Sequence, residues 1–256
     1  MADGGGKPGV PVAIITGASR GIGFGAAQRF VESGYAVCIT GRKAEALEAS
    51  RAELQSKGAD VLAVAGDAQA GAHRDTVIEA AIKRWGRIDV LVNNAATSPF
   101  LGPVLEAEMR HLERAWTINV ATPWAWCKAA VNAHMGEYGG AIVNVASVGG
   151  MYQVPRVGLY NISKAALLHM TRQLALELAP TVRVNAVAPA TIRTEFARAK
   201  YEGREQEVAD QFPLRRLGTP HEVGAAIVML CDGTLDWVTG QTIVLDGGAS
   251  LIQGVV

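Results

Sequence analysis

The sequence predicts an α/β fold in which about seven parallel strands form one doubly wound sheet with helices on both faces. Short apolar runs recur along the chain, and longer stretches with helical spacing of apolar residues lie between them. The runs are almost continuously apolar, as expected for strands that are buried on both faces. The expected strands are Val12–Thr16, Ala36–Thr40, Val61–Ala65, Asp89–Asn93, Ala141–Ala146, Val182–Val187 and Thr242–Leu245.

The expected helices alternate with these strands and cover residues 26–33, 44–56, 76–85, about 105–134 and 160–178. No change in composition divides the chain, so we expect one domain over residues 10–256, after a flexible, glycine-rich tail at 1–9. A charged segment at about 190–218 follows a strand end and interrupts the alternation. Such an insertion is a candidate substrate lid. The alternative is an ordinary solvated helical excursion.

The composition argues against several classes of partner. Hydrophobic residues make up 49% of the 256 residues, enough for a large core, and 24 basic residues balance 24 acidic ones. A chain of zero net charge without long runs of one sign is not expected to bind nucleic acid or an acidic membrane. Because no long apolar segment is present, we expect neither a signal peptide nor a membrane span, and a soluble, cytoplasmic protein.

The cysteines and histidines do not predict a metal site. Cys38, Cys127 and Cys231 are odd in number, widely spaced and set among apolar residues, and the five histidines lack ligand spacing. This pattern favours buried thiols in a reducing compartment over a disulfide framework or a zinc site.

A glycine-rich loop follows the first expected strand. It reads TGASRGIG over residues 16–23, with glycine at 17, 21 and 23. Glycines at this spacing let the backbone turn tightly and approach a pyrophosphate, which the N-terminus of the next helix attracts. The alternative is a strand-to-helix turn that binds nothing. The position of the loop in a repeating α/β chain favours dinucleotide binding.

Two arginines indicate which dinucleotide binds. Sites that prefer NAD carry an acidic residue about 20 residues after the loop, where it bonds the ribose 2′-hydroxyl. Here Gly41 holds that place, Arg42 follows it, and Arg20 lies within the glycine loop. Two guanidinium groups suit a 2′-phosphate, so we expect NADP(H) as the cofactor.

Tyr160 and Lys164 are four residues apart in the sequence YNISK, at the start of an expected helix. Residues at this spacing lie on one face of a helix. A phenol can protonate a carbonyl oxygen if its pKa falls from about 10 towards the working pH, and a neighbouring ammonium stabilises the phenolate. We therefore expect Tyr160 to be a general acid whose pKa Lys164 lowers. The alternative is a surface pair.

With these residues in view, the chain from about Val10 to Leu251 resembles the short-chain dehydrogenase/reductase family, whose fold is a single Rossmann-like domain. It looks closest to members that reduce 3-oxoacyl thioesters and related ketones. The motifs that carry the resemblance occur in the family order: TGASRGIG at 16–23, Asp67, NNAA at 93–96, Asn119, Ser147, YNISK at 160–164 and PATIRT at 189–194.

The resemblance implies a set of cofactor-binding residues. Asp67 would meet the adenine, Asn93 would steady the sheet, and the segment from Pro189 would hold the nicotinamide. Ala96 and Ala190 stand where the family often has glycine, and the methyl group of Ala190 would displace the nicotinamide loop slightly. The implied cofactor-binding residues are Gly17, Ser19, Arg20, Gly21, Ile22, Gly23, Arg42, Asp67, Ala68, Asn94, Ala95, Tyr160, Lys164, Pro189, Ile192 and Thr194.

The implied catalytic residues are Asn119, Ser147, Tyr160 and Lys164. Ser147 would hydrogen-bond the substrate oxygen and stabilise its developing charge. Lys164 would also bind the nicotinamide ribose, and the main-chain carbonyl of Asn119 would hold a water in a proton relay to Lys164. The alternatives are a turn residue for Ser147 and a satisfied buried amide for Asn119.

The expected function is NADPH-dependent reduction of a carbonyl substrate, with a 3-oxoacyl thioester of fatty acid metabolism as the first candidate. Arginines of the charged segment would meet the phosphates of its coenzyme A or carrier-protein arm; the alternative is that they pair with the acidic residues of the same segment. Alternatives are a secondary-alcohol, polyol or steroid dehydrogenase of the same family, or a nucleotide-sensing protein without catalysis. Apolar surface on the helices at 105–134 and after Tyr160, and the apolar C-terminal stretch, predict a homotetramer with dihedral symmetry.

Overall fold

Seven parallel strands form one sheet in the computed structural model, which describes residues 9–252. The strand order is β3-β2-β1-β4-β5-β6-β7, so the chain winds outward from β1 and then, from β4, in the opposite direction. This order confirms the predicted doubly wound sheet. The expected tail falls almost entirely outside the described residues. The strands are β1 (Val12–Ile15), β2 (Ala36–Gly41), β3 (Val61–Ala65), β4 (Val90–Asn93), β5 (Gly140–Val145), β6 (Val182–Pro189) and β7 (Thr242–Leu245).

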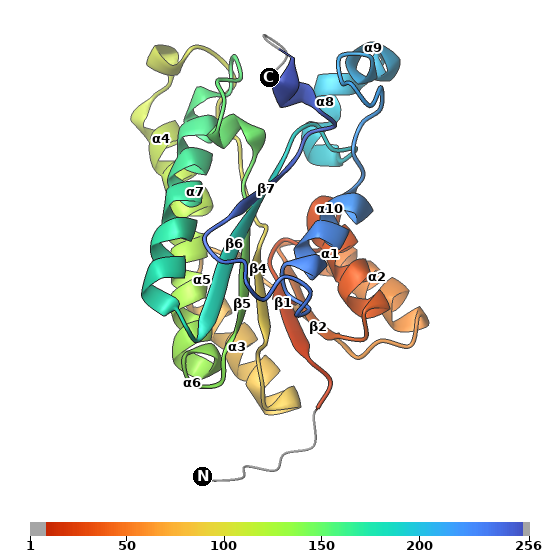
Figure 1. Cartoon of the computed structure of the whole chain (residues 1–256), viewed down its shortest axis with the longest axis vertical. Coiled ribbons are helices and arrows are strands. Elements are labelled where there is room, and N and C mark those ends of the chain that lie inside the picture. The colour runs from red at the N-terminus through yellow and green to blue at the C-terminus, as the bar shows by residue number, and fades with distance from the viewer. Residues whose placement is uncertain (1–8, 253–256) are drawn as a thin grey trace.

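Helices cover both faces of the sheet (Figure 1). One face carries α1 (Gly21–Glu32), α2 (Ala44–Ser56) and α10 (Pro220–Met229). The other carries α3 (Gly71–Trp85), α5 (Thr122–Ala130) and α7 (Gly158–Leu178). Each layer has its own buried apolar cluster, in which the central strands contribute alternate residues to the two sides.

The prediction of one helix over about 105–134 is wrong about where the helix starts and about its being a regular α-helix throughout. A 3-10 turn, η1 (Val104–Glu106), is followed by a break, and α4 (Met109–Trp116) begins only after it. Two π-helical turns, η2 (Thr117–Ala121) and η3 (Val131–Met135), then flank α5, and a short α6 (Gly136–Tyr138) ends the run. Apolar spacing does not reveal such turns, because a π-turn inserts a residue without changing the composition of the buried face.

The carboxyl edge of the sheet carries the segment expected to form a lid. Within it lie η5 (Glu195–Ala197), α8 (Arg198–Tyr201) and α9 (Glu205–Ala209), which stand above the strand ends in Figure 1. Further short 3-10 turns are η4 (Val148–Gly150) and η6 (Ala249–Leu251). The segment is therefore helical, and its position at this edge is where open α/β sheets bind ligands.

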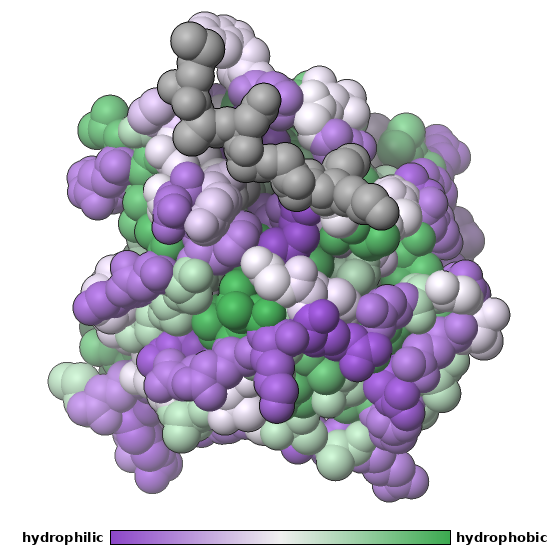
Figure 2. Space-filling view, turned by 90° about the horizontal axis from the view of Figure 1, so that it is seen from below, coloured by the Kyte–Doolittle hydropathy of each residue, from purple (hydrophilic) through white to green (hydrophobic). Residues whose placement is uncertain are grey.

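The opposite edge of the molecule shows mostly hydrophilic residues around smaller apolar groups (Figure 2). Within residues 9–252, no helix combines the length and the apolar character that a membrane crossing needs. The three cysteines are free; Cys38 and Cys127 are buried, whereas Cys231 is partly exposed. No group of three potential ligands in the described chain could hold a metal ion.

Candidate functional site

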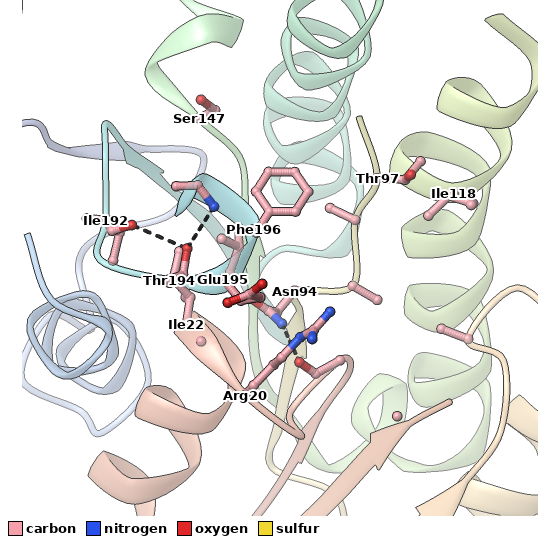
Figure 3. A pocket seen from close by; sticks show the side chains of 18 of the residues that line it. Arg20, Ile22, Asn94, Thr97, Ile118, Ser147, Ile192, Thr194, Glu195 and Phe196 are labelled. Carbon is pink, nitrogen blue, oxygen red and sulfur yellow. Dashed lines mark hydrogen bonds between the residues drawn. The ribbon is translucent and has the colours of Figure 1, made fainter. Parts of the chain in front are cut away.

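A cavity of about 290 Å³ opens at the carboxyl ends of the central strands. It lies where the strand order reverses between β1 and β4, the usual binding position in a doubly wound sheet. Every predicted site residue lines it except Gly23 and Asn119. Figure 3 shows ten of the lining residues by name, from Arg20 on the glycine loop to Phe196 on the lid segment.

The glycine loop is shaped to bring backbone close to a ligand. Gly17 and Gly21 have φ values of +65° and +57°, a region that residues with a Cβ rarely adopt. A Cβ at Gly17 would stand 3.0 Å from Ala95 Cα. One at Gly23 would stand 2.6 Å from the Gly17 carbonyl oxygen, so Gly23 packs beneath the loop and does not line the cavity. The N-terminus of α1 faces this cradle, an arrangement that suits a phosphate.

Thr16 and Asn94 hold the loop against the end of β4. The Thr16 hydroxyl oxygen accepts hydrogen bonds from the main-chain N–H groups of Asn94 (2.9 Å) and Ala95 (3.1 Å). The Asn94 amide in turn donates to the carbonyl oxygens of Thr16 (2.8 Å) and Gly17 (3.0 Å). Deeper in the sheet, Asn93 donates to the Asn144 side-chain oxygen at 3.0 Å, linking β4 to β5.

Two guanidinium groups and one carboxylate lie at the end of the cavity next to β2. Arg20, Arg42 and Asp67 all line it. Burial raises the pKa of Asp67, but hydrogen bonds from Gln69 and the nearby guanidinium groups outweigh burial, and the net pKa falls below its usual value. One of those guanidiniums is that of Arg114, which the sequence analysis missed. Arg114 lies one helical turn before Ile118, another lining residue. This helical spacing is the sequence feature that connects Arg114 with the cavity.

Lys164 is held at the centre of the site. Its side chain is 2% exposed and its Nζ donates to the Val145 carbonyl oxygen at 2.7 Å. The same Nζ lies 5.6 Å from the centroid of the Tyr160 ring. The predicted pairing of the ammonium and the phenol on one face of α7 is therefore present, and both side chains line the cavity.

The expected lowering of the Tyr160 pKa is wrong for the ligand-free protein. Tyr160 is partly exposed to the cavity, yet enough protein surrounds it that burial raises its pKa to about 12, against the hydrogen bond with Ser147, which lowers it. Burial also lowers the pKa of Lys164 to about 7. A lysine that is only partly protonated at neutral pH stabilises a phenolate less than a full charge would.

Asn119 does not line the cavity, and its side chain makes hydrogen bonds to two neighbouring residues. Its amide oxygen accepts a hydrogen bond from the Thr97 N–H (2.8 Å), and its Nδ2 donates to the Thr97 carbonyl (2.8 Å) and to Ser163 Oγ (2.9 Å). Ser163 Oγ donates to the Tyr160 carbonyl oxygen at 2.7 Å. The buried amide is therefore satisfied, and it links the loop after β4 to the first turn of α7.

Ser147 follows β5 after Ala146, in extended backbone with φ of −168°. Its hydroxyl oxygen accepts a hydrogen bond from the Gly149 N–H at 3.1 Å, which caps η4. The side chain nevertheless lines the cavity, so the turn role and a ligand role are compatible. Ala96 and Ala190, the two departures from the family pattern, line the cavity as well.

Main-chain hydrogen bonds join the two ends of the lid segment and close it at its base. The Arg193 N–H donates to the Gly218 carbonyl oxygen (2.9 Å), and the Gly218 N–H donates to the Thr191 carbonyl oxygen (3.3 Å). Inside this closure, the Tyr201 hydroxyl donates to the Thr194 carbonyl oxygen at 3.0 Å and fixes α8 against η5. Phe196 and Lys200 line the cavity from this side.

Most arginines of the lid segment are paired with carboxylates, either of the segment itself or, for Arg216, of α10. Arg193 pairs with Glu205, and the remaining pairs are Arg198 with Glu195 and Glu202, Arg204 with Glu207, and Arg216 with Glu222. Exposed pairs of this kind add little stability. This pairing is the alternative that the sequence left open, and it leaves less positive charge to attract the phosphates of a thioester arm.

The lowered pKa of Lys164 predicts a pH dependence of stability. Between pH 7, its pKa in the folded protein, and 10.5, its ordinary value, the unfolded chain binds more protons than the folded one. The free energy of unfolding should therefore rise with pH through this window, and the cost of burying the lysine is fully present below it. In Lys164→Met this rise should be smaller.

Urea unfolding of the parent and of Lys164→Met at about pH 7 and about pH 9 measures the difference. The exposed Lys83→Met is the matched control and should keep the parent's pH dependence. The same pH dependence in Lys164→Met and in the parent would contradict the assignment.

Comparisons with known proteins agree with this geometry. Residues 17–250 match a family model described as enoyl-(acyl carrier protein) reductase. The chain is 35% identical to dehydrogenase/reductase SDR family member 4 of Mus musculus over 240 residues, which cover 93% of this chain and 86% of the mouse protein. It also superposes on an actinorhodin polyketide ketoreductase solved with NADPH, with a TM-score of 0.90, 29% identity, and coverage of 95% and 98%. ElxO with NADP bound gives a TM-score of 0.87, 30% identity, and coverage of 95% and 100%.

Proposed function

Because the chain belongs to the short-chain dehydrogenase/reductase family, we propose that it reduces a carbonyl compound to an alcohol with NADPH. The observation that carries the proposal is the meeting of Ser147, Tyr160 and Lys164 in the cavity that the glycine loop also lines. When bound, NADPH supplies the hydride for the carbonyl carbon.

The residues present suit NADP(H). The positive-φ glycines and the N-terminus of α1 form a cradle that a Cβ would fill, as a pyrophosphate site requires. Arg20 and Arg42 line the end of the cavity where the 2′-phosphate would lie. Two solved relatives described above, a polyketide ketoreductase and ElxO, carry NADPH and NADP. Pro189, Ile192 and Thr194 would hold the nicotinamide end.

Tyr160 would donate its proton to the substrate oxygen while the Ser147 hydroxyl hydrogen-bonds the same atom. The raised pKa of Tyr160 keeps the phenol protonated at neutral pH, which supports a role as acid in the reductive direction. Lys164 and the Asn119–Ser163 hydrogen bonds would hold the phenol in place. An inactive nucleotide sensor is disfavoured because all three cavity groups are present.

A 3-oxoacyl thioester is the first candidate substrate. Its support is the description of the matching family model and the similarity to a polyketide ketoreductase. The pairing of the lid arginines removes part of the case for binding a phosphate-rich arm. A secondary-alcohol, polyol or steroid dehydrogenase activity is the alternative.

We further propose a cytoplasmic homotetramer. Trp116 at the end of α4 and Trp124 in α5 are each about half exposed. Buried aromatic residues of this size are typical of subunit interfaces. Light scattering at micromolar concentration measures the assembly, and a monomer would contradict it.

The test of the proposed activity is NADPH consumption with two classes of substrate. Acetoacetyl-coenzyme A represents the thioesters and a cyclohexanone represents simple ketones. A higher kcat/KM for acetoacetyl-coenzyme A would support the thioester assignment, and preference for the ketone would refute it. Failure to consume NADPH with either class or with a wider ketone panel would overturn the reductase proposal itself.

A further inference from the structure

Phe196 is an exposed aromatic residue inside the site. Its side chain is 59% exposed, although it stands on a short 3-10 turn and not on an open surface loop. It lines the same cavity as Ser147 and Tyr160, and Figure 3 shows it there. The centroids of its ring and of the Tyr160 ring are 6.0 Å apart, with an angle of 44° between their planes.

Single exposed apolar side chains are common on protein surfaces. Phe196 is unusual because its exposed ring lines the cavity of the candidate site. Phe196 is held where it is by two contacts of Thr194: the Thr194 hydroxyl accepts a hydrogen bond from the Ala197 N–H (3.3 Å), and its carbonyl oxygen accepts one from the Tyr201 hydroxyl (3.0 Å). These two hydrogen bonds therefore stabilise the turn that places the Phe196 ring in the cavity.

The surroundings of Phe196 favour an apolar ligand. Met151 and Tyr152, which follow η4 in the chain, are also exposed. Arg193 and Arg198 of the lid segment are paired with carboxylates of the same segment, and Lys200 is the basic residue of the segment that lines the cavity. An apolar ring that is left open in this cavity can gain contact area when a ligand covers it.

We infer that Phe196 is a specificity-determining residue that packs against the substrate, and that among simple ketones it favours those bearing an apolar ring next to the carbonyl group. The inference rests on the proposed carbonyl reduction. Once Ser147 and Tyr160 hold the carbonyl oxygen, the groups on the carbonyl carbon extend towards the lid segment, where Phe196 can meet a ring edge-on or offset.

The test compares two methyl ketones with the same number of carbon atoms, acetophenone and 2-octanone. In the parent, kcat/KM for acetophenone should exceed that for 2-octanone. In Phe196→Ala this ratio should fall about tenfold, which corresponds to about 1.4 kcal/mol, the upper part of the range for an aromatic pair. Phe196→Tyr, which keeps the ring, should retain most of the preference.

Two controls separate substrate contact from damage to the lid. Leu214→Ala removes another exposed apolar side chain of the same segment that does not line this cavity, and it should leave the ratio unchanged. The KM for NADPH should stay within twofold of the parent in Phe196→Ala. The reason is that the ring contacts the substrate and not the cofactor.

An unchanged ratio in Phe196→Ala, or an equal loss for both ketones, would overturn the inference while the reductase proposal stands. A rise in the KM for NADPH that accounts for the whole loss would also overturn it, because Phe196 would then cover the cofactor. If the parent consumes NADPH with no ketone at all, both proposals fail.

Discussion

Replacing Tyr160 with phenylalanine should abolish carbonyl reduction and leave NADPH binding nearly unchanged. The substitution keeps the ring, which lies 6.0 Å from that of Phe196, and removes only the hydroxyl that would protonate the substrate. Loss of a positioned general acid reduces turnover by about 10² to 10⁴. Steady-state kcat with the best ketone or thioester, together with NADPH affinity by calorimetry, measures both parts of the expectation.

Tyr152→Phe is the matched control. Tyr152 is 37% exposed and does not line the cavity, so loss of its hydroxyl should change kcat little. If Tyr160→Phe turned over within tenfold of the parent, the barrier would have risen by less than about 1.4 kcal/mol. Tyr160 would then not be the acid.

Changing Arg42 to aspartate should weaken NADPH binding and spare NADH. The guanidinium lines the end of the cavity where the 2′-phosphate is proposed to lie, and a carboxylate there would repel that phosphate. A charge-assisted hydrogen bond contributes about 1.5–3 kcal/mol, so NADPH affinity should fall by at least about tenfold. The ratio of kcat/KM for the two cofactors measures the change.

The neighbouring Lys43→Asp carries the same change in charge at a position that does not line the cavity. It should alter the cofactor ratio far less, since exposed charges are screened by salt. Equal affinities of the parent for NADPH and NADH would remove the basis for the assignment to Arg42.

Strand positions followed from the sequence because burial on both faces leaves an unbroken apolar run. β1, β2 and β4 are buried along their whole length, and their observed limits lie within one residue of the expected ones. The long middle helix could not be placed in this way. Its π-turn at 117–121 coincides with contacts to Thr97, a residue of the preceding loop, and such long-range contacts leave no periodic signal.

The site residues could be found because the motifs place them at strand ends and on one helix face, positions that the topology brings together. The pKa shifts of these residues could not be predicted from the motifs. The spacing of Tyr160 and Lys164 indicates a pair of groups, but the direction of the Tyr160 pKa depends on how much protein encloses the pair. Phe196 was missed for a similar reason, since only the packing of the lid segment turns its ring into the cavity.

The closure at the base of the lid segment makes residues 195–217, which follow Thr194 at the proposed nicotinamide end of the site, an exchangeable cassette. The main-chain bonds of Gly218 with Thr191 and Arg193 fix the two stems beside each other, independently of what lies between them. For a loop with fixed ends, doubling its length costs only about 0.6 kcal/mol in closure entropy. Insertions or transplants in this cassette can therefore remodel the substrate wall while the sheet, the glycine loop and the helix that carries Tyr160 keep their places. Substrate range and cofactor use can diverge separately in such a scaffold.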